Sequence, residues 1–309
     1  MTERNLRARI QTGVFVLDGA MGTQLIARGV EPGRCNDWLN VELPNMVLDV
    51  HRAYIDAGSD AIITNTFGAN RYTLGRHGCA DKAFEINKAG AQVARKAAGE
   101  SRYVLGDIGP TGDFLEPLGT LKPEQVREAF IEQVNGLRDG GVDGLIIETM
   151  TAIDELEVAI EAARSAGGGL PVLASMSFDK GGAGFRTMMG VDVATAVSKM
   201  IALGVDAVGF NCGTTTLDEY LELSKAYVAA ANGKVQVFAE PNAGKPELVG
   251  SEAVYKVTPE EFAAACRKIL DAGIHILGGC CGSTPDHIGA VAGALKQWAV
   301  LMSFDEQDR

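Results

Sequence analysis

The sequence predicts an α/β protein in which one (β/α)8 barrel, the TIM-barrel fold, forms a single domain over residues 1–309. Three observations lead to this prediction. Eight short apolar runs recur about every 37 residues, and patterns typical of amphipathic helices separate them. A glycine–x–aspartate pattern stands before alternate runs. No change of composition typical of a linker divides the chain, and eight βα units of this size are typical of a barrel.

The eight runs are predicted to be buried parallel strands, because they are mostly continuous apolar segments rather than alternating ones. An open doubly wound sheet is the alternative. It is less favoured because no Gly-x-Gly-x-x-Gly pattern follows the first strand. The predicted strands cover residues 14–18, 61–65, 103–107, 144–148, 171–175, 207–211, 235–240 and 274–278.

Helices are predicted between the strands from apolar spacing and from start signals. Residues 44–57 and 123–137 place apolar side chains three or four positions apart, as in a helix that covers a sheet. Residues 258–261 (TPEE) form a capping box with proline at the first helical position. Thr284 followed by proline begins the last predicted helix in the same way.

A small internal repeat supports a regular architecture. Gly58, Gly141 and Gly204 each open a glycine–x–aspartate pattern, and Gly273 opens a weaker fourth copy in which histidine replaces aspartate. The copies precede the second, fourth, sixth and eighth predicted strands. Each glycine is expected to end a helix in the left-handed conformation, directly before a strand begins.

Composition and charge exclude several classes of protein. Hydrophobic residues make up 46% and charged residues 22%, which excludes a disordered or fibrous chain. The net charge of −12 argues against nucleic acid or an anionic membrane as the main partner. The N-terminal segment lacks the apolar core of a signal peptide, and no apolar stretch is long enough to span a membrane. We therefore expect a cytoplasmic protein whose six cysteines are buried, metal-bound or catalytic rather than disulfide-linked.

Polar residues end all eight predicted strands, where the active sites of barrels lie. Cys212 ends the sixth strand, and the adjacent Cys280 and Cys281 follow the eighth. Adjacent side chains on a regular strand point in opposite directions, so the pair can converge only where flanking glycines release the backbone. Three thiolates suit Zn²⁺ and leave its fourth position open for a substrate. Buried cysteines serving as small apolar side chains, or a phosphate site built from glycine amides, are the alternatives.

Zinc held by three thiolates has a net charge near −1 and is a poor Lewis acid for activating water. It can still lower the pKa of an incoming thiol and hold it as a reactive thiolate. This chemistry favours alkyl transfer to a substrate sulfur over hydrolysis. A carboxylate at the end of an apolar strand needs a partner, which makes Glu148 a candidate site residue. Asp107 is interpreted as structural, and Cys35, Cys79 and Cys266 as ordinary thiols.

Seven segments resemble those of the homocysteine S-methyltransferases, and the likeness runs from about residue 10 to 298. It is closest to the N-terminal homocysteine-binding module of cobalamin-dependent methionine synthase, whereas the betaine and S-methylmethionine enzymes are more distant. The segments are 18–23 (DGAMGT), 64–67 (TNTF), 106–112 (GDIGPTG), 148–149 (ET), 211–213 (NCG), 240–244 (EPNAG) and 278–285 (GGCCGSTP).

The resemblance implies a role for each matching residue. Homocysteine would bind through its sulfur to a zinc ion, and its amino group would face Asp18 and Glu148. Thr66 and the amides around Gly19 and Ala20 would contact the substrate carboxylate or other polar groups. Asn242 matches a residue that can occupy the fourth zinc position without substrate. The implied zinc ligands are Cys212, Cys280 and Cys281.

The methyl donor is not evident from the sequence, because the chain ends at residue 309, about where the homocysteine module ends. The resemblance favours methylcobalamin on a separate corrinoid protein, or an excised module whose mouth docks such a partner. A small donor such as betaine or S-methylmethionine is the alternative. A non-catalytic zinc-binding or partner-binding barrel is a further hypothesis. An aldolase-like barrel with a phosphate site is less favoured, because no strand ends in the lysine that Schiff-base chemistry needs.

Overall fold

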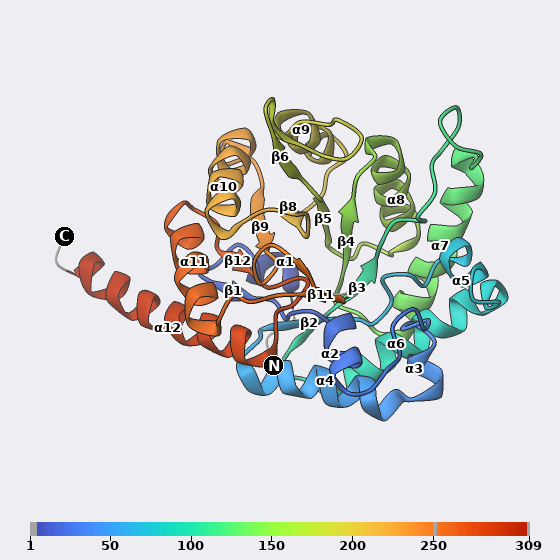
Figure 1. Cartoon of the computed structure of the whole chain (residues 1–309), viewed down its shortest axis with the longest axis horizontal. Helices are drawn as coiled ribbons and strands as arrows, with labels where there is room; N and C mark the ends of the chain where they lie inside the picture. Colours follow the sequence, from blue (N-terminus) through green and yellow to red (C-terminus); the bar gives the residue numbers. More distant parts are fainter. Residues whose placement is uncertain (1–4, 250–251, 308–309) are drawn as a thin grey trace.

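The structure, a computed structural model, describes residues 5–249 and 252–307 and contains the predicted barrel (Figure 1). The other residues of the predicted domain, 1–4, 250–251 and 308–309, lie outside these ranges. All neighbouring strands of the barrel run parallel, and each falls on one of the eight predicted runs. The barrel strands are β1 (Phe15–Val16), β2 (Ala61–Ile63), β3 (Tyr103–Ile108), β4 (Gly144–Met150), β5 (Val172–Met176), β8 (Ala207–Asn211), β9 (Gln236–Glu240) and β12 (Ile276–Leu277).

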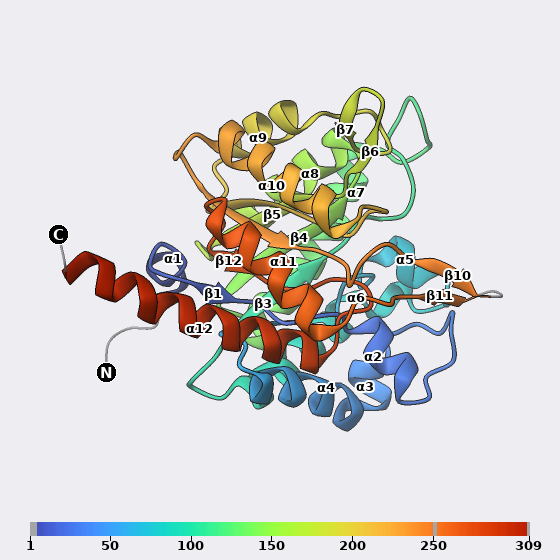
Figure 2. The same ribbon diagram turned by 60° about the vertical axis from the view of Figure 1, so that its left-hand side comes forward.

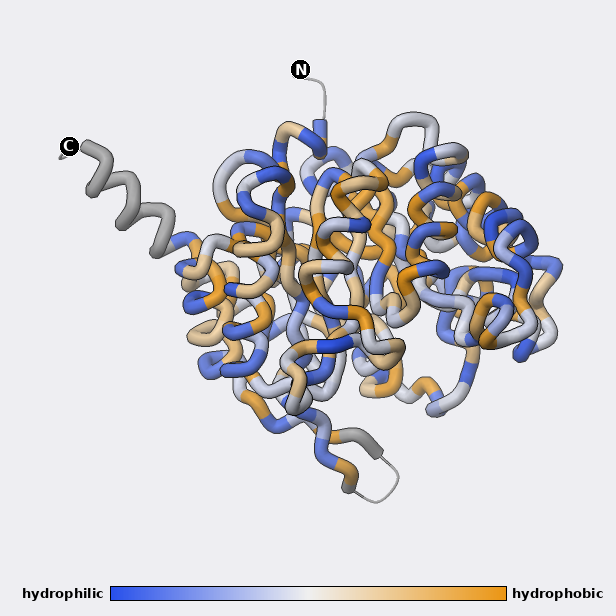
Figure 3. The backbone as a smooth tube through the Cα atoms, turned by 90° about the horizontal axis from the view of Figure 1, so that it is seen from above, coloured by the Kyte–Doolittle hydropathy of each residue, from blue (hydrophilic) through white to orange (hydrophobic). Residues whose placement is uncertain are grey.

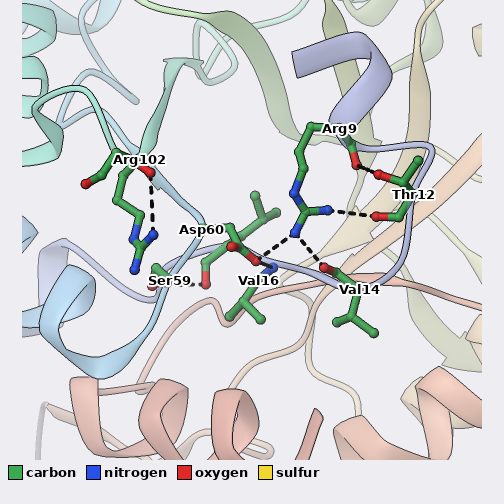
Figure 4. A network of polar contacts seen from close by, with 9 residues as sticks. Arg9, Thr12, Val14, Val16, Ser59, Asp60 and Arg102 are labelled. Carbon is green, nitrogen blue, oxygen red and sulfur yellow. Dashed lines mark hydrogen bonds and ion pairs between the residues drawn. The ribbon is translucent and has the colours of Figure 1, made fainter. Parts of the chain in front are cut away.

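Two aspartate side chains bridge the seam between β1 and β2. These strands stand at opposite ends of the sheet order β1-β12-β9-β8-β5-β4-β3-β2. At the amino-terminal side of the seam, the Val16 amide donates to Asp60 Oδ2 at 2.9 Å, and the Asp60 amide donates to the Val16 carbonyl at 2.7 Å (Figure 4). At the carboxyl side, the Ile63 amide donates to Asp18 Oδ2 at 3.0 Å. Both aspartates therefore help to close the barrel.

The interior of the barrel is layered, because side chains of a strand alternate between its two faces. The amino-terminal layer is apolar. Two residues closer to the carboxyl end of several strands, the side chains that point into the barrel are polar. Asp107 follows Leu105 in this way, and Glu148 follows Ile146. The fully buried residues of the apolar layer include Phe15, Ala61, Leu105, Ile146, Leu173, Ala207, Phe238 and Ile276, one from each strand. The polar layer above them is where the candidate site lies.

Eight helices form the outer ring of the described structure, and their buried apolar residues belong to one core cluster with residues of the strands. Figure 3 shows hydrophobic and hydrophilic residues alternating along the coiled segments. None of the described helices is long and apolar enough to cross a membrane. The helices of the ring are α4 (Pro44–Ala57), α6 (Ala83–Ala98), α7 (Pro123–Gly140), α8 (Ile153–Ala166), α9 (Val193–Ala202), α10 (Leu217–Ala231), α11 (Pro259–Asp271) and α12 (Pro285–Gln307). The short helices are α1 (Leu6–Arg9), α2 (Gly22–Ala27), α3 (Leu39–Glu42), α5 (Arg71–Gly75) and the 3-10 helix η1 (Ala80–Lys82).

The predicted helix signals are confirmed. Thr258 caps α11 in a reciprocal capping box with Glu261, and a proline opens each of α4, α7 and α11. The glycines of the internal repeat all have positive φ, as expected for helix ends. Their φ angles are +113° at Gly58, +91° at Gly141, +72° at Gly204 and +105° at Gly273.

The aspartates of the repeat have one shared function in the fold. The side chains of Asp60, Asp143 and Asp206 each accept from the amide of the first or second residue of the preceding barrel strand, and their own amides donate back to the carbonyl of the same residue. For Asp143 these bonds join Val104 at 2.7 and 2.8 Å. Each of the three carboxylates also pairs with an arginine. The repeat therefore fixes the register of strand pairs β1–β2, β3–β4 and β5–β8.

Helix α1 closes the amino-terminal end of the barrel. Leu6 and Ile10 are buried with the apolar interior layer. Arg9 donates to Asp60 and to the carbonyls of Thr12 and Val14 (Figure 4). The amino-terminal end of the barrel interior is therefore covered.

Two hairpins extend the loops at the carboxyl end and were not predicted from the sequence. One consists of β6 (Asp179–Gly181) and β7 (Gly184–Arg186), the other of β10 (Glu247–Val249) and β11 (Glu252–Val254). The β10–β11 hairpin projects from the body of the barrel (Figure 2). Their strands are three residues long, and β6 is exposed throughout, so β6 carries no buried apolar pattern that could predict it.

Candidate active site at the mouth of the barrel

A cavity of about 580 Å³ opens at the carboxyl ends of the barrel strands. Its wall is contributed by the carboxyl ends of seven strands or the loops that follow them, and it includes both sulfur and carboxyl groups. Sequence analysis expected functional residues at this end of the barrel, and the structure brings many of them to one cavity. Its lining includes Gly19, Ala20, Thr64, Asp107, Glu148, Cys212, Glu240, Cys280 and Cys281.

The three predicted cysteines meet in this cavity, and in the described part of the chain they form the only cluster of Cys, His, Asp or Glu suited to a metal ion. All three sulfurs lie within 4.8 Å of one another. The Sγ atoms of Cys212 and Cys281 are 3.9 Å apart, and those of Cys280 and Cys281 are 4.0 Å apart. Two sulfurs at the usual 2.3 Å from a tetrahedral zinc ion lie about 3.8 Å apart. The spacing therefore fits zinc.

Backbone conformation explains how two neighbouring cysteines point to one place. Strand β12 ends at Leu277, so Cys280 and Cys281 lie beyond regular strand geometry. The loop is held by the Cys280 amide, which donates to the Pro241 carbonyl at 2.8 Å, and by the Cys281 carbonyl, which accepts from the Ala243 amide at 3.0 Å. Cys212 itself adopts a left-handed φ of +56°, rare for a residue other than glycine. Such strain is typical of functional sites.

Hydrogen bonds among the three thiols shift their pKa values in different directions. Bonds from Cys212 and Cys280 lower the pKa of Cys281, whereas the bonds to Cys212 and Cys281 raise the pKa of Cys280. Without a metal ion, the cluster therefore favours a single thiolate on Cys281. A divalent cation would favour the thiolate form of all three.

Asn242 is buried beside the loop that carries Cys212. Its Nδ2 donates to the Gly213 carbonyl at 2.8 Å, while its Oδ1 is buried without a hydrogen-bond partner. An orphaned amide oxygen is a weak, neutral metal ligand. This observation agrees with the predicted role of Asn242 but leaves it a prediction.

Asn211 joins the sulfur cluster to the carboxyl groups. Its Nδ2 donates to Glu148 Oε2 at 2.9 Å and to Thr149 Oγ1 at 2.7 Å, and lies 3.8 Å from Cys280 Sγ. Its Oδ1 accepts from the Thr149 amide and from the Ser175 hydroxyl, each at 2.8 Å. Thr149 has a left-handed φ of +60°. Asn211 therefore holds Glu148 and a strained turn in place.

Four carboxyl groups lie at the carboxyl ends of β1, β3, β4 and β9. Burial raises the pKa of Asp18, Asp107, Glu148 and Glu240, and the charge of Glu148 raises it further for the other three. For Glu148 burial raises the pKa to about 7, against a hydrogen bond with Asp107 that lowers it. Such groups favour their neutral forms unless a cation joins them.

The predicted substrate residues occupy different depths. Glu148 lines the cavity, whereas Asp18 lies behind its neighbour Gly19 and is 2% exposed. A Cβ at Gly19 would lie 2.6 Å from Ser283 Oγ, so only glycine fits there. The Ala20 amide already donates to Ser283 Oγ at 3.1 Å.

Thr66 is fully buried and does not line the cavity. Its hydroxyl donates to the Asp107 carbonyl at 2.9 Å and lies 2.6 Å from the Thr64 hydroxyl. Thr64 and Asn65, from the same turn, line the cavity in its place. A role for Thr66 in substrate contact stays a prediction.

The sequence predictions set Asp107 aside as structural and gave no role in the site to Glu240 or Asn211. All three lie in the polar interior layer, at even spacing after the apolar residues Leu105, Phe238 and Ala207. The alternation of strand side chains was the signal that could have found them. The histidine set aside as a ligand, His287, is occupied elsewhere: it contacts Thr284 and the Val257 carbonyl.

The sequence model described as "Homocysteine S-methyltransferase" matches residues 15–295. The chain belongs to the homocysteine S-methyltransferase family. The predicted family is therefore confirmed, and with it the enzyme class, a methyltransferase. Methionine synthases from Mycobacterium leprae (strain TN) and Mycobacterium tuberculosis (strain ATCC 25618 / H37Rv) are each 37% identical to this homocysteine S-methyltransferase chain. The matches cover 92% and 91% of the chain.

The chain spans about a quarter of the length of these relatives, since each match covers 24% of the methionine synthase. Among solved structures, the metallated form of the homocysteine methyltransferase MmuM from Escherichia coli aligns with a TM-score of 0.77 and 23% identity. That alignment covers 93% of this chain and 99% of the MmuM chain. It supports the barrel fold.

Proposed function

We propose that this chain methylates homocysteine to methionine, with a zinc ion bound by Cys212, Cys280 and Cys281. The observation that carries the proposal is the meeting of three sulfurs and several buried carboxyl groups in one cavity. When bound there, zinc lowers the pKa of the substrate thiol, so that the substrate sulfur reacts as a thiolate. The protein supplies no nucleophile of its own in this scheme.

The residues of the chain bind and orient the substrate. Glu148, held by Asn211, faces the cavity and can pair with the substrate ammonium. Asp18 does not line the cavity, so in this scheme it acts through the charge of its carboxylate and by fixing the position of Gly19, which does. Methyl transfer then forms a bond between the substrate sulfur and the methyl carbon, while the bond from that carbon to the donor breaks and its electron pair stays with the donor.

We propose methylcobalamin on a separate corrinoid protein as the donor. Two observations support a large partner at the mouth. The methionine synthases that match are about four times as long as this chain, so further parts accompany this module there. In addition, large exposed apolar side chains lie between the end of a barrel strand and the ring helix that follows it or, for Phe84, in the first turn of such a helix, and two of them, Ile26 and Phe67, line the cavity. Those found in the described residues are Ile26, Leu43, Phe67, Phe84, Leu118, Met188 and Leu248.

A panel of methyl donors tests this function. Zinc-loaded protein and homocysteine are incubated with methylcobalamin, betaine, S-methylmethionine or S-adenosylmethionine, and methionine is measured. We expect methionine with methylcobalamin, together with the spectral change of demethylated cobalamin. Cys281→Ser should lose both zinc and activity. Turnover with betaine or S-methylmethionine alone would refute the corrinoid donor. Zinc and homocysteine binding without turnover by any donor would instead indicate a non-catalytic barrel.

A further inference from the structure

Three carboxylate oxygens buried at the mouth of the barrel have no hydrogen-bond partner among the described residues. They are Asp18 Oδ1, Asp107 Oδ1 and Glu240 Oε2. Their side chains are 2%, 4% and 1% exposed, respectively. A buried polar atom without a partner costs free energy. Three of them in one region indicate a place for a hydrogen-bond donor that comes with a ligand.

Two of these oxygens belong to residues on the surface of the cavity. Asp107 and Glu240 line it together with Glu148, and the three come from β3, β9 and β4. Each of the three interacts electrostatically with another, and Asp107 shares a hydrogen bond with Glu148. Asp18 lies behind them and interacts with Glu240 and Glu148. Two of the three lining carboxyl groups therefore lie on the neighbouring strands β3 and β4, and the third lies on β9, on the wall of the same cavity.

The protein supplies little positive charge to this space. Among the described residues that line the cavity, only Arg34 and His77 are basic, and both come from the outer loops. Arg34 pairs with Glu42 at 2.6 Å. No ion pair with a basic side chain is present at Asp107, Glu148 or Glu240 among the described residues, so a cationic ligand would supply the charge that these buried carboxyl groups lack.

We infer that Asp107 and Glu240 bind the substrate ammonium together with Glu148, and that this cage selects thiols that carry a primary ammonium. The inference rests on the proposed function, because it assigns residues to the same substrate. A primary ammonium has three N–H donors, and three carboxyl groups line the cavity. Acylation of the nitrogen removes the charge and two of the donors. N-Acetylhomocysteine should therefore bind much more weakly than homocysteine.

The test compares homocysteine with 4-sulfanylbutanoate, which lacks only the amino group. Dissociation constants are measured by calorimetry on zinc-loaded wild type, Asp107→Asn and Glu240→Gln. These variants keep the shape of the side chain but lose its charge. We expect each to weaken homocysteine binding roughly 10- to 100-fold, as for loss of a charged hydrogen bond, and to leave 4-sulfanylbutanoate nearly unchanged. The preference for homocysteine, measured as the ratio of the two dissociation constants, should therefore fall by the same factor.

Glu155→Gln is the matched control. Glu155 is also a buried carboxylate, but it lies on α8, accepts from the Thr111 amide and hydroxyl at 2.7 Å each, and is absent from the cavity wall. Its substitution should leave the preference for homocysteine unchanged. Equal losses for both ligands in Asp107→Asn and Glu240→Gln would show a structural role and overturn the inference.

A second measurement separates this inference from the proposed function. In metal-free protein, methionine is compared with 4-(methylsulfanyl)butanoate, so that neither thiol nor zinc takes part. The cage predicts a preference for methionine that both variants reduce. If that preference is present but zinc-loaded protein fails to bind homocysteine, the proposed function fails and the cage stands. If zinc-loaded protein binds thiols but neither experiment shows a preference for the ligand that carries the ammonium, the cage is refuted and the proposed function stands.

Discussion

Replacement of Asn211 by alanine is expected to weaken both the fold and the metal cluster. The side chain accepts from the Thr149 amide at 2.8 Å and donates to Glu148 at 2.9 Å, within a region that is partly or fully buried. Its loss would remove these two hydrogen bonds together with those to the Thr149 and Ser175 hydroxyls, and a buried group left without a partner costs about 1–3 kcal/mol. It would also release the left-handed turn at Thr149. We therefore expect the free energy of unfolding to fall by roughly 3 kcal/mol.

The effect on zinc follows from the contact between Asn211 Nδ2 and Cys280 Sγ, at 3.8 Å. Residues that orient metal ligands from behind typically contribute 10- to 100-fold in metal affinity. We expect Asn211→Ala to bind zinc roughly tenfold more weakly in competition with a chromophoric chelator. It should also bind homocysteine more weakly, because Glu148 loses its donor. Urea unfolding of the metal-free protein measures the stability term separately.

Asn87→Ala is the control for general destabilisation. Asn87 is a fully buried amide that donates to the Ala69 and Ala83 carbonyls at 2.7 Å each, and it does not line the cavity. It should lower stability by a similar amount without changing zinc affinity. Wild-type zinc affinity in Asn211→Ala would refute the positioning role. An equal loss of zinc affinity in Asn87→Ala would show that destabilisation alone explains the effect.

Three further predictions concern the fold. Asp143→Ala removes the carboxylate that accepts the Val104 amide, and should lower the free energy of unfolding by about 2 kcal/mol in urea denaturation; an unchanged midpoint would contradict the register role. Gly209→Ala places a Cβ 2.5 Å from the Phe238 ring and should cost about 1–3 kcal/mol; wild-type thermal stability would show that the ring moves freely. Burial lowers the pKa of His51 to about 3, so below its unfolded value near 6.5 only the unfolded chain takes up this proton and stability falls. His51→Leu should gain on the order of 2 kcal/mol relative to wild type between pH 7 and pH 5, and parallel pH profiles would exclude this explanation.

The barrel could be predicted because its strands are continuous apolar runs and its helix ends carry glycines. These are local signals that do not depend on the neighbours of a strand. Helix α1 and the two hairpins could not be predicted in this way. Leu6 is buried only because the open end of the barrel requires a cover, and β6 lies wholly on the surface. Their structure depends on tertiary contacts rather than on a periodic pattern.

The residues of the site also fall into those that have a local signal in the sequence and those that only the fold reveals. The cysteines were found because their chemistry is rare and their flanking glycines explain how they converge. Asp107 was interpreted as structural and Glu240 was given no role, because a carboxylate at a strand end is common. Only the closed barrel shows that three carboxyl groups line one cavity. Thr66 shows a different limit of the sequence. A motif predicts it in the site, and only the fold shows that its hydroxyl bonds to the Thr64 hydroxyl and the Asp107 carbonyl, so a role in substrate contact stays a prediction.

Asp18 shows why structural and substrate roles must be separated by measurement. Its Oδ2 helps to close the seam between β1 and β2 through the Ile63 amide, and its Oδ1 is an unpartnered oxygen next to the acidic cage. Loss of homocysteine binding in Asp18→Asn therefore has two physical explanations. If the residue only shapes the wall, homocysteine and 4-sulfanylbutanoate should lose affinity together. If its charge acts on the ammonium through Glu148 and Glu240, homocysteine alone should lose affinity, because the analogue carries no positive charge at that position.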